Sequence, residues 1–191
     1  MGLTYSTLDK QNHVDSVLYE IDMLRFTTRK LVESDWKEYR EAWVYLEAFL
    51  LHYRNLLDFF GNENPRDTDV HVSNIWKMEN IPTPSNLPEI QTDGINLRNI
   101  YEPKDGVRIS QHVQHITTKR VEPKDWQLHA MLRDLDPLLA KIENHLRPHG
   151  KAKLMPEEPM MLHGPHSAST SVCTETAAAW ALLHRDWKKI E

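Results

Sequence analysis

One stretch of the chain, from Trp36 to Phe60, carries large apolar side chains every three or four residues without a break. Such spacing places all of them on one side of a single α-helix. The stripe consists of Trp36, Tyr39, Trp43, Leu46, Leu50, Tyr53, Leu57 and Phe60. A long helix with one apolar side must bury that side against other elements. We therefore expect an all-α fold organised around this helix.

Other segments repeat the same helical spacing of apolar residues. They cover about residues 8–32, 88–101, 107–119 and 123–147. Because only a few residues separate the first two helical patterns, these helices should form an antiparallel hairpin. Gly61 ends the long helix, Gly94 weakens the 88–101 helix, and Pro137 suggests a kink or a restart in the last one. The pattern predicts an antiparallel four- or five-helix bundle.

The remaining segments lack such a pattern or stand apart from the bundle. Residues 62–87 predict an irregular connector, held to the bundle by Ile75 and Trp76, in which a short strand pair is possible. We place a bundle domain at 1–149 and a flexible linker with a short amphipathic helix at 150–191. That helix is marked by Trp180, Leu183, Trp187 and Ile190, and it can dock on the bundle or on a partner.

Composition narrows the class of protein. A chain of 191 residues with 40% hydrophobic content suits one core, and a net charge of -5 gives no support for nucleic-acid binding. The single cysteine excludes an intramolecular disulfide.

No apolar run approaches the length of a membrane span, so we expect a soluble cytoplasmic protein. Glycine-rich phosphate loops and serine nucleophile elbows are missing, and no cofactor is expected.

Four polar residues on the long helix form the one cluster with a catalytic character: His52, Arg54, Asn55 and Asp58. His52 shares a helix side with apolar residues, so it can equally be a hydrogen-bonded core histidine. Arg54 lies one turn before Asp58, a spacing that forms an ordinary ion pair on a helix. His52, Arg54 and Asn55 are therefore candidate catalytic residues with a structural alternative.

The segment from Phe49 to Phe60 contains the pattern His-x-Arg-Asn-Leu at His52 to Leu56. This segment resembles an uncharacterised family of bacterial helical proteins. The resemblance covers roughly residues 40–70 and extends in a looser form to Leu146. It implies a helical fold and no particular activity.

A second resemblance involves Arg66 and His71, which follow the long helix. An arginine followed a few residues later by a histidine is similar to the motif of HEPN ribonucleases, a superfamily of helical proteins. Arg108 and His115 have a related spacing. The resemblance implies metal-independent RNA cleavage, with His71 assisting the 2'-hydroxyl and Arg66 stabilising phosphate charge, usually across a dimer.

A pair of histidines, His112 and His115, has the spacing of one helical turn. Two imidazoles so placed can bind one metal ion, with His129 or His52 as a third ligand. The chain lacks the Glu-x-x-His pattern of di-metal bundles, so such a site would have to assemble from separate helices.

Amphipathic surface is plentiful in this sequence, whereas a complete catalytic motif is missing. These two observations favour a non-enzymatic module that associates with itself or with a protein partner. A HEPN-type ribonuclease that uses Arg66 and His71 is the enzymatic alternative, and a metal-binding bundle that uses His112 and His115 is the third.

Overall fold

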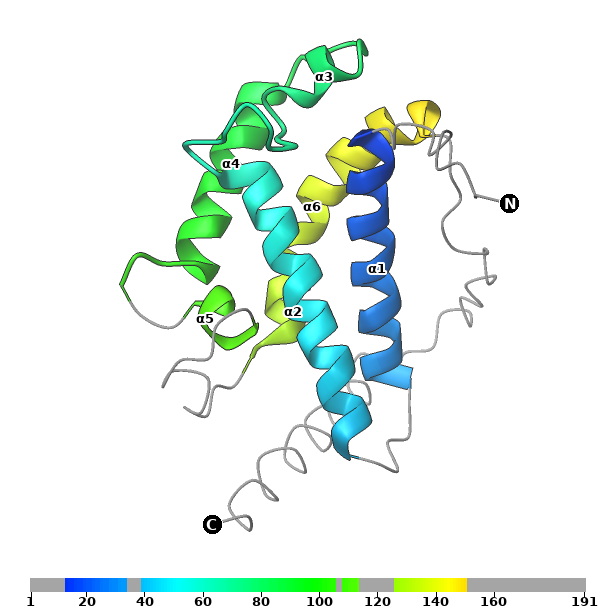
Figure 1. Ribbon diagram of the computed structural model, residues 1–191, viewed down its shortest axis with the longest axis vertical. Helices are drawn as coiled ribbons and strands as arrows, with labels where there is room; N and C mark the ends of the chain where they lie inside the picture. The colour runs from blue at the N-terminus through cyan, green and yellow to red at the C-terminus, as the bar shows by residue number, and fades with distance from the viewer. Residues whose placement is uncertain (1–12, 34–38, 106–107, 114–125, 151–191) are drawn as a thin grey trace, which may run out of the picture.

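A computed structural model describes residues 13–33, 39–105, 108–113 and 126–150 of the chain (Figure 1). Four long helices form the frame: α1 (His13–Glu33), α2 (Tyr39–Gly61), α4 (Leu87–Tyr101) and α6 (Leu128–Leu146). Three short elements accompany them: α3 (Ile75–Met78), α5 (Ile109–Val113) and the 3-10 turn η2 (Arg147–His149). The described residues contain no strand, so the predicted all-α class is confirmed.

The four long helices form a closed bundle. Helix α1 packs on α2, α2 on α4, α4 on α6, and α6 again on α1. Consecutive helices run in opposite directions, as Figure 1 shows. Two ion pairs confirm that α1 and α6 are antiparallel. Asp22 of α1 pairs with Arg147, whereas Arg25, which comes later in α1, pairs with Glu143, which comes earlier in the chain than Arg147. The predicted antiparallel bundle is therefore confirmed.

Helix α2 supplies the largest part of the core. Its buried side chains are Leu46, Phe49, Leu50, Tyr53, Leu56, Leu57, Phe59 and Phe60. Burial of each such side chain stabilises the fold by about 1.5–3 kcal/mol. Five members of the predicted stripe, from Leu46 to Phe60, lie in this core, and Trp43 packs partly buried against it. The side chains of Trp36 and Tyr39 lie outside the described residues.

The connector between α2 and α4 is irregular but firmly attached. Trp76 is 2% exposed, and its indole Nε1 donates a hydrogen bond of 2.6 Å to the carbonyl of Val72. Val72 in turn donates its backbone N–H to the carbonyl of Phe59 at 3.0 Å. Ile75 is fully buried. The predicted role of Ile75 and Trp76 is confirmed, whereas the possible strand pair does not form anywhere in residues 62–87.

Several predicted boundaries need correction. The last helix, predicted from Pro123, begins at Leu128, because Gln127 and the buried Trp126 before it are not helical; residues 123–125 lie outside the described part. It then continues through Pro137 without a restart. Helix α5 covers 109–113, and the rest of the predicted 107–119 helix falls mainly outside the described residues. The predicted segments 8–12 and 151–191, including the terminal helix, also lie outside them.

Helices α2 and α4 touch through their backbones at Gly61 and Gly94. A Cβ atom on Gly61 would lie 2.3 Å from the carbonyl oxygen of Gly94. A Cβ on Gly94 would lie 2.6 Å from the Cβ of Phe60 and 2.7 Å from its backbone carbonyl. Gly94 was expected to weaken its helix, but it is the residue that lets α4 approach α2 this closely.

We expect the substitution Gly94→Ala to destabilise the protein by about 1–3 kcal/mol, because the added methyl group has no space against the backbone of α2. At an ordinary helix position the same change stabilises by roughly 0.5–1 kcal/mol, so the sign of the effect is diagnostic. Urea denaturation followed by circular dichroism measures it. The exposed Asn96→Ala on the same helix is the control and should be neutral or slightly stabilising. A Gly94→Ala variant as stable as the parent would contradict the close contact.

Candidate functional site

A polar cluster joins α1 to α2 beside the core. The carboxylate oxygen Oε2 of Glu20 accepts hydrogen bonds from His52 Nδ1 at 2.8 Å and from Asn55 Nδ2 at 3.1 Å. The His52 side chain is 7% exposed and that of Glu20 is 24% exposed. Tyr19 sets its ring edge-on to the imidazole, with centroids 5.8 Å apart. The cluster therefore brings together two predicted site residues and one, Glu20, that the sequence analysis missed.

The chemistry available to His52 follows from these contacts. A carboxylate on Nδ1 places the proton of the neutral ring on that nitrogen and directs the lone pair to Nε2, as in a general-base dyad. A reactant would need access to Nε2, yet the ring lies almost closed off between the helices beneath Tyr19. The arrangement corresponds to the predicted hydrogen-bonded core histidine, and its effect is to hold α1 against α2.

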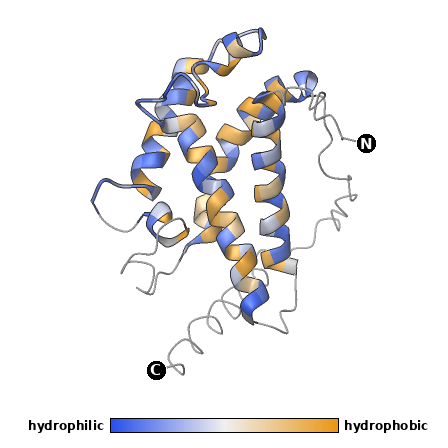
Figure 2. Cartoon of the chain, viewed as in Figure 1, coloured by the Kyte–Doolittle hydropathy of each residue, from blue (hydrophilic) through white to orange (hydrophobic). Residues whose placement is uncertain are grey.

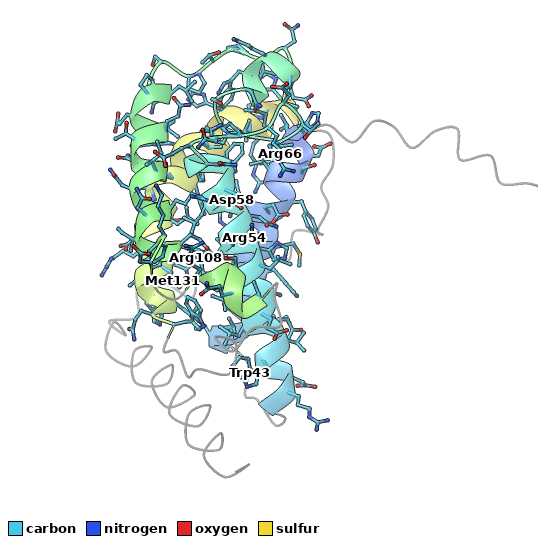
Figure 3. The ribbon with its side chains drawn as sticks, turned by 60° about the vertical axis from the view of Figure 1, so that its left-hand side comes forward. Trp43, Arg54, Asp58, Arg66, Arg108 and Met131 are labelled. Carbon is cyan, nitrogen blue, oxygen red and sulfur yellow. The ribbon has the colours of Figure 1, made fainter. Side chains whose placement is uncertain are left out.

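The second polar group is an ion network between α2 and α4. Asp58 accepts from Arg54 Nη2 at 3.0 Å and from Arg98 Nε at 3.1 Å. Figure 3 shows Arg54 and Asp58 following one another along α2, toward the end of the bundle where Arg66 lies. The predicted pairing of Arg54 with Asp58 is confirmed. Arg98 was not predicted, because its approach depends on the packing of α4.

The two residues that resemble a ribonuclease motif occupy different environments. Arg66 has an exposed side chain, and its backbone N–H bonds to the Asp69 carboxylate at 2.9 Å. His71 is 5% exposed and bonds through its backbone N–H to Asn74 Oδ1 at 3.0 Å, at the entrance to α3. The interactions of His71 are thus with its own loop and not with Arg66. The ribonuclease assignment stays a prediction.

One nitrogen of the His71 imidazole is buried without a hydrogen-bond partner among the described residues. Ser73 donates its backbone N–H to His71 Nδ1 at 3.2 Å, so the proton of the neutral ring belongs on Nε2. Nε2 is buried and has no hydrogen-bond partner within the described part of the chain. Burial lowers the pKa of His71, and the charge of Asp69 offsets only part of that effect. The imidazole is therefore held neutral inside the connector.

The predicted metal site cannot be assembled from the described residues. The side chain of His112 and all of His115 fall outside them, while His52 is already bonded to Glu20. Over residues 13–33, 39–105, 108–113 and 126–150, no three His, Cys, Asp or Glu side chains come together as metal ligands. Metal binding by His112 and His115 remains a prediction.

Two tyrosines in contact, the buried Tyr53 and the partly buried Tyr101, link α2, α4 and α6. The Tyr53 hydroxyl donates to the carbonyl of Met131 at 3.0 Å, and the Tyr101 hydroxyl donates to Asp134 Oδ2 at 2.7 Å. Their rings meet edge to face at 5.4 Å. Burial raises the pKa of both phenols, and for Tyr101 burial and the hydrogen bond to Asp134 raise it to about 12. Both phenols are therefore neutral donors at physiological pH.

Apolar side chains gather on the outer side of the α1–α2 pair. We define the α1–α2 face as Tyr19, Met23 and Phe26 of α1 together with Val44, Tyr45, Ala48 and Leu51 of α2. Val44 is 64% exposed, and Tyr19 and Leu51 are each 37% exposed. Phe26 and Tyr45 meet across the two helices with centroids 6.2 Å apart. Figure 2 shows apolar colouring along much of the N-terminal half of α2, where Val44 to Leu51 lie.

Comparison with protein-family models, with curated proteins and with solved structures finds no significant match to this chain. The resemblances noted from the sequence therefore remain predictions. Among the helices that the structure describes, none is long and apolar enough to cross a membrane.

Removal of the Glu20 carboxylate tests the cluster. We expect Glu20→Ala to lower the free energy of unfolding by about 1–3 kcal/mol, because His52 and Asn55 each lose a partly buried charged acceptor. Chemical denaturation measures the change. Glu89→Ala is the matched control, since its side chain is 63% exposed in the pair with Lys141, and its effect should stay within about 1 kcal/mol. If the two variants lost the same free energy of unfolding, the polar cluster would not be what stabilises the packing of α1 on α2.

The neutral His71 predicts a pH dependence of stability. Because its folded pKa lies below the usual value of 6.5, the unfolded chain binds the proton more readily. The contribution of neutral His71 is therefore complete above about pH 6.5 and is lost progressively as the pH falls below it. In His71→Asn, whose amide oxygen can still accept from Ser73, the drop in melting temperature between pH 7.5 and pH 5.5 should be smaller than in the parent. An unchanged drop would show that other groups govern stability in this range.

Proposed function

We propose that this chain is a non-enzymatic helical interaction module that pairs with a second copy of itself through the α1–α2 face. The observation that carries the proposal is that Val44, Leu51 and Tyr19 are all exposed on one pair of packed helices. The polar groups around them bond to one another, whereas these apolar side chains face solvent. Contiguous exposed apolar surface marks association sites more often than single exposed residues do.

The composition of the face suits an interface core. Tyrosine, phenylalanine and methionine are enriched at the centres of protein interfaces. Two rings of this face, Phe26 and Tyr45, already contact each other, and Tyr19 contacts the buried His52 behind it. Side chains held in place before binding lose less conformational entropy when they bind. A partner therefore meets a surface that is largely pre-organised.

Charge placement supports a second copy as that partner. Along α1 the face is flanked by Glu20, which also accepts from His52 and Asn55, toward one end and by Lys30 toward the other. Along α2 the face is flanked by Arg54, which also pairs with Asp58, toward the first end and by the exposed Glu41 toward the second. A two-fold axis lying in the face and perpendicular to the helices brings each end of one copy against the opposite end of the other. Glu20 then approaches Lys30 of the other copy, and Arg54 approaches Glu41.

Both charge pairs require the two-fold axis to cross the helix pair at the same position along the helices. The midpoint between Glu20 and Lys30 on α1 is Arg25, next to Phe26, and the midpoint between Arg54 and Glu41 on α2 falls between Glu47 and Ala48, less than one turn beyond Tyr45. These two aromatic residues are already neighbours across the helix pair. One two-fold axis can thus satisfy both pairs while stacking the apolar centres of the two faces, which is the complementarity that a homodimer needs.

We expect the full-length protein to be a dimer and the double variant Val44→Glu, Leu51→Glu to be a monomer, because two carboxylates would be buried in the apolar centre of the interface. Sedimentation velocity over a range of concentrations measures the mass. Ile100→Glu is the matched control, because Ile100 is 62% exposed on α4, away from the face, and this variant should remain a dimer.

Circular dichroism on all three proteins separates loss of pairing from loss of folding. A parent chain that stays monomeric at every concentration, or a folded double variant that still dimerises, would refute pairing through the α1–α2 face.

A further inference from the structure

We propose that residues 66–78 of the connector form an acid-sensitive flap, and that protonation of His71 releases this flap from the end of the bundle while the four long helices stay folded. Figure 1 shows the connector and α3 at one end of the bundle. Release of the flap is independent of pairing through the α1–α2 face. Three features carry the inference: the closed environment of the His71 ring, the weak countercharge beside it, and the sparse attachment of the flap to the helices.

The environment of the His71 ring suits its neutral form. His71 is 5% exposed, and its Nδ1 accepts the backbone N–H of Ser73 at 3.2 Å. The Ser73 hydroxyl lies 2.7 Å from the same nitrogen, and Nε2 has no hydrogen-bond partner among the described residues. A protonated ring has an N–H on both nitrogens. It would set one N–H against the Ser73 amide and leave the other without an acceptor, whereas water satisfies both once the ring is released.

The charges around His71 do not compensate for a buried positive ring. Asp69 of the connector raises the pKa of His71, but burial lowers it by more. On α2, Asp58 is already paired with two arginines. After α3, Glu79 pairs with His13 of α1 at 2.5 Å. Protonation of His13 strengthens that pair, so acid does not release the connector at this point.

The flap is bonded mainly within itself. Among the described residues, one hydrogen bond joins it to a long helix, from the N–H of Val72 to the carbonyl of Phe59 on α2 at 3.0 Å. The indole of Trp76 bonds back to Val72 within the flap. On α6, the exposed His145 meets the Trp76 ring edge-on, with centroids 6.5 Å apart. Burial of Ile75 and Trp76 therefore holds the flap in place, and its internal bonds can survive release.

Acid shifts the flap toward release. The pKa of the buried His71 lies below the usual 6.5, so the released ring binds a proton more readily than the buried one. The closed flap is therefore fully stabilised above about pH 6.5 and loses stability as the pH falls below that value. Between pH 7.5 and pH 5.5 the released population should rise several-fold, and about tenfold is the limit for one proton. Release uncovers Ile75 and Trp76, which adds apolar surface at this end of the bundle.

Amide hydrogen exchange, measured by NMR on the full-length protein, tests the flap. The Val72 amide is the reporter, because release breaks its bond to Phe59. The Tyr53 amide in the middle of α2 reports unfolding of the whole bundle. Protection factors remove the direct effect of pH on the exchange chemistry. We expect a smaller protection factor at Val72 than at Tyr53 at both pH values, and a several-fold lower one at Val72 at pH 5.5 than at pH 7.5.

Two variants separate His71 from other groups. His71→Asn keeps an acceptor for the Ser73 amide but cannot take up a proton, so the fall in Val72 protection at pH 5.5 should disappear. His149→Gln is the matched control, because His149 is exposed in η2 at the same end of the bundle, and it should show the same fall as the parent. If His71→Asn does not fold, His71→Gln takes its place.

Equal protection of Val72 and Tyr53 would show that the segment leaves only when the whole protein unfolds, and it would overturn the flap. A parent without the fall, or a fall that persists in the folded His71 variant, would overturn His71 as the trigger. Far-UV circular dichroism of the parent at pH 5.5 should match that at pH 7.5. A loss of helical signal at pH 5.5 would overturn release from an intact bundle.

Discussion

The backbone contact between Gly61 and Gly94 is the constraint on which much of the bundle depends. Because neither residue has a side chain, α2 and α4 approach until their main chains touch. This close approach fixes the position of α4 along the length of α2. It places Arg98 beside Asp58, and further down the pair it places Tyr101 against Tyr53. A side chain at either glycine would move these partners apart together, since one rigid helix carries all of them.

Polar contacts between helices share a common design. Each pair of neighbouring helices is joined by a charged or polar pairing beside its apolar contact: Glu20 with His52, Asp58 with Arg98, Lys141 with Glu89, and Glu143 with Arg25. Such pairings add modest stability, and they select one alignment of the helices over others. The polar side chains that join the described helices are therefore paired with one another, whereas Tyr19, Val44 and Leu51 on the α1–α2 face are exposed. This contrast is the basis on which we propose association through that face.

Prediction from sequence succeeded where a property depends on local spacing. The apolar stripe of α2, the pairing of Arg54 with Asp58 and the attachment of Trp76 to the bundle all follow from residues close together in the chain. It failed where two distant segments meet. Gly94 looks like a defect when α4 is considered alone, and the start of α6 at Leu128 depends on how Trp126 enters the core. Glu20 carries no local sign that it will receive both His52 and Asn55.

The amino-acid sequence by itself determined that this protein is helical, which side of each long helix is apolar, and that neighbouring helices run antiparallel. These properties follow from periodicity and short connections, which act within a few residues. Only the tertiary structure decided which polar groups become partners, that His71 is buried as a neutral ring while Arg66 stays at the surface, and which apolar side chains remain exposed. The physical reason is that burial and hydrogen bonding depend on distances between helices, and the relative position of two helices is set by the packing of the whole core.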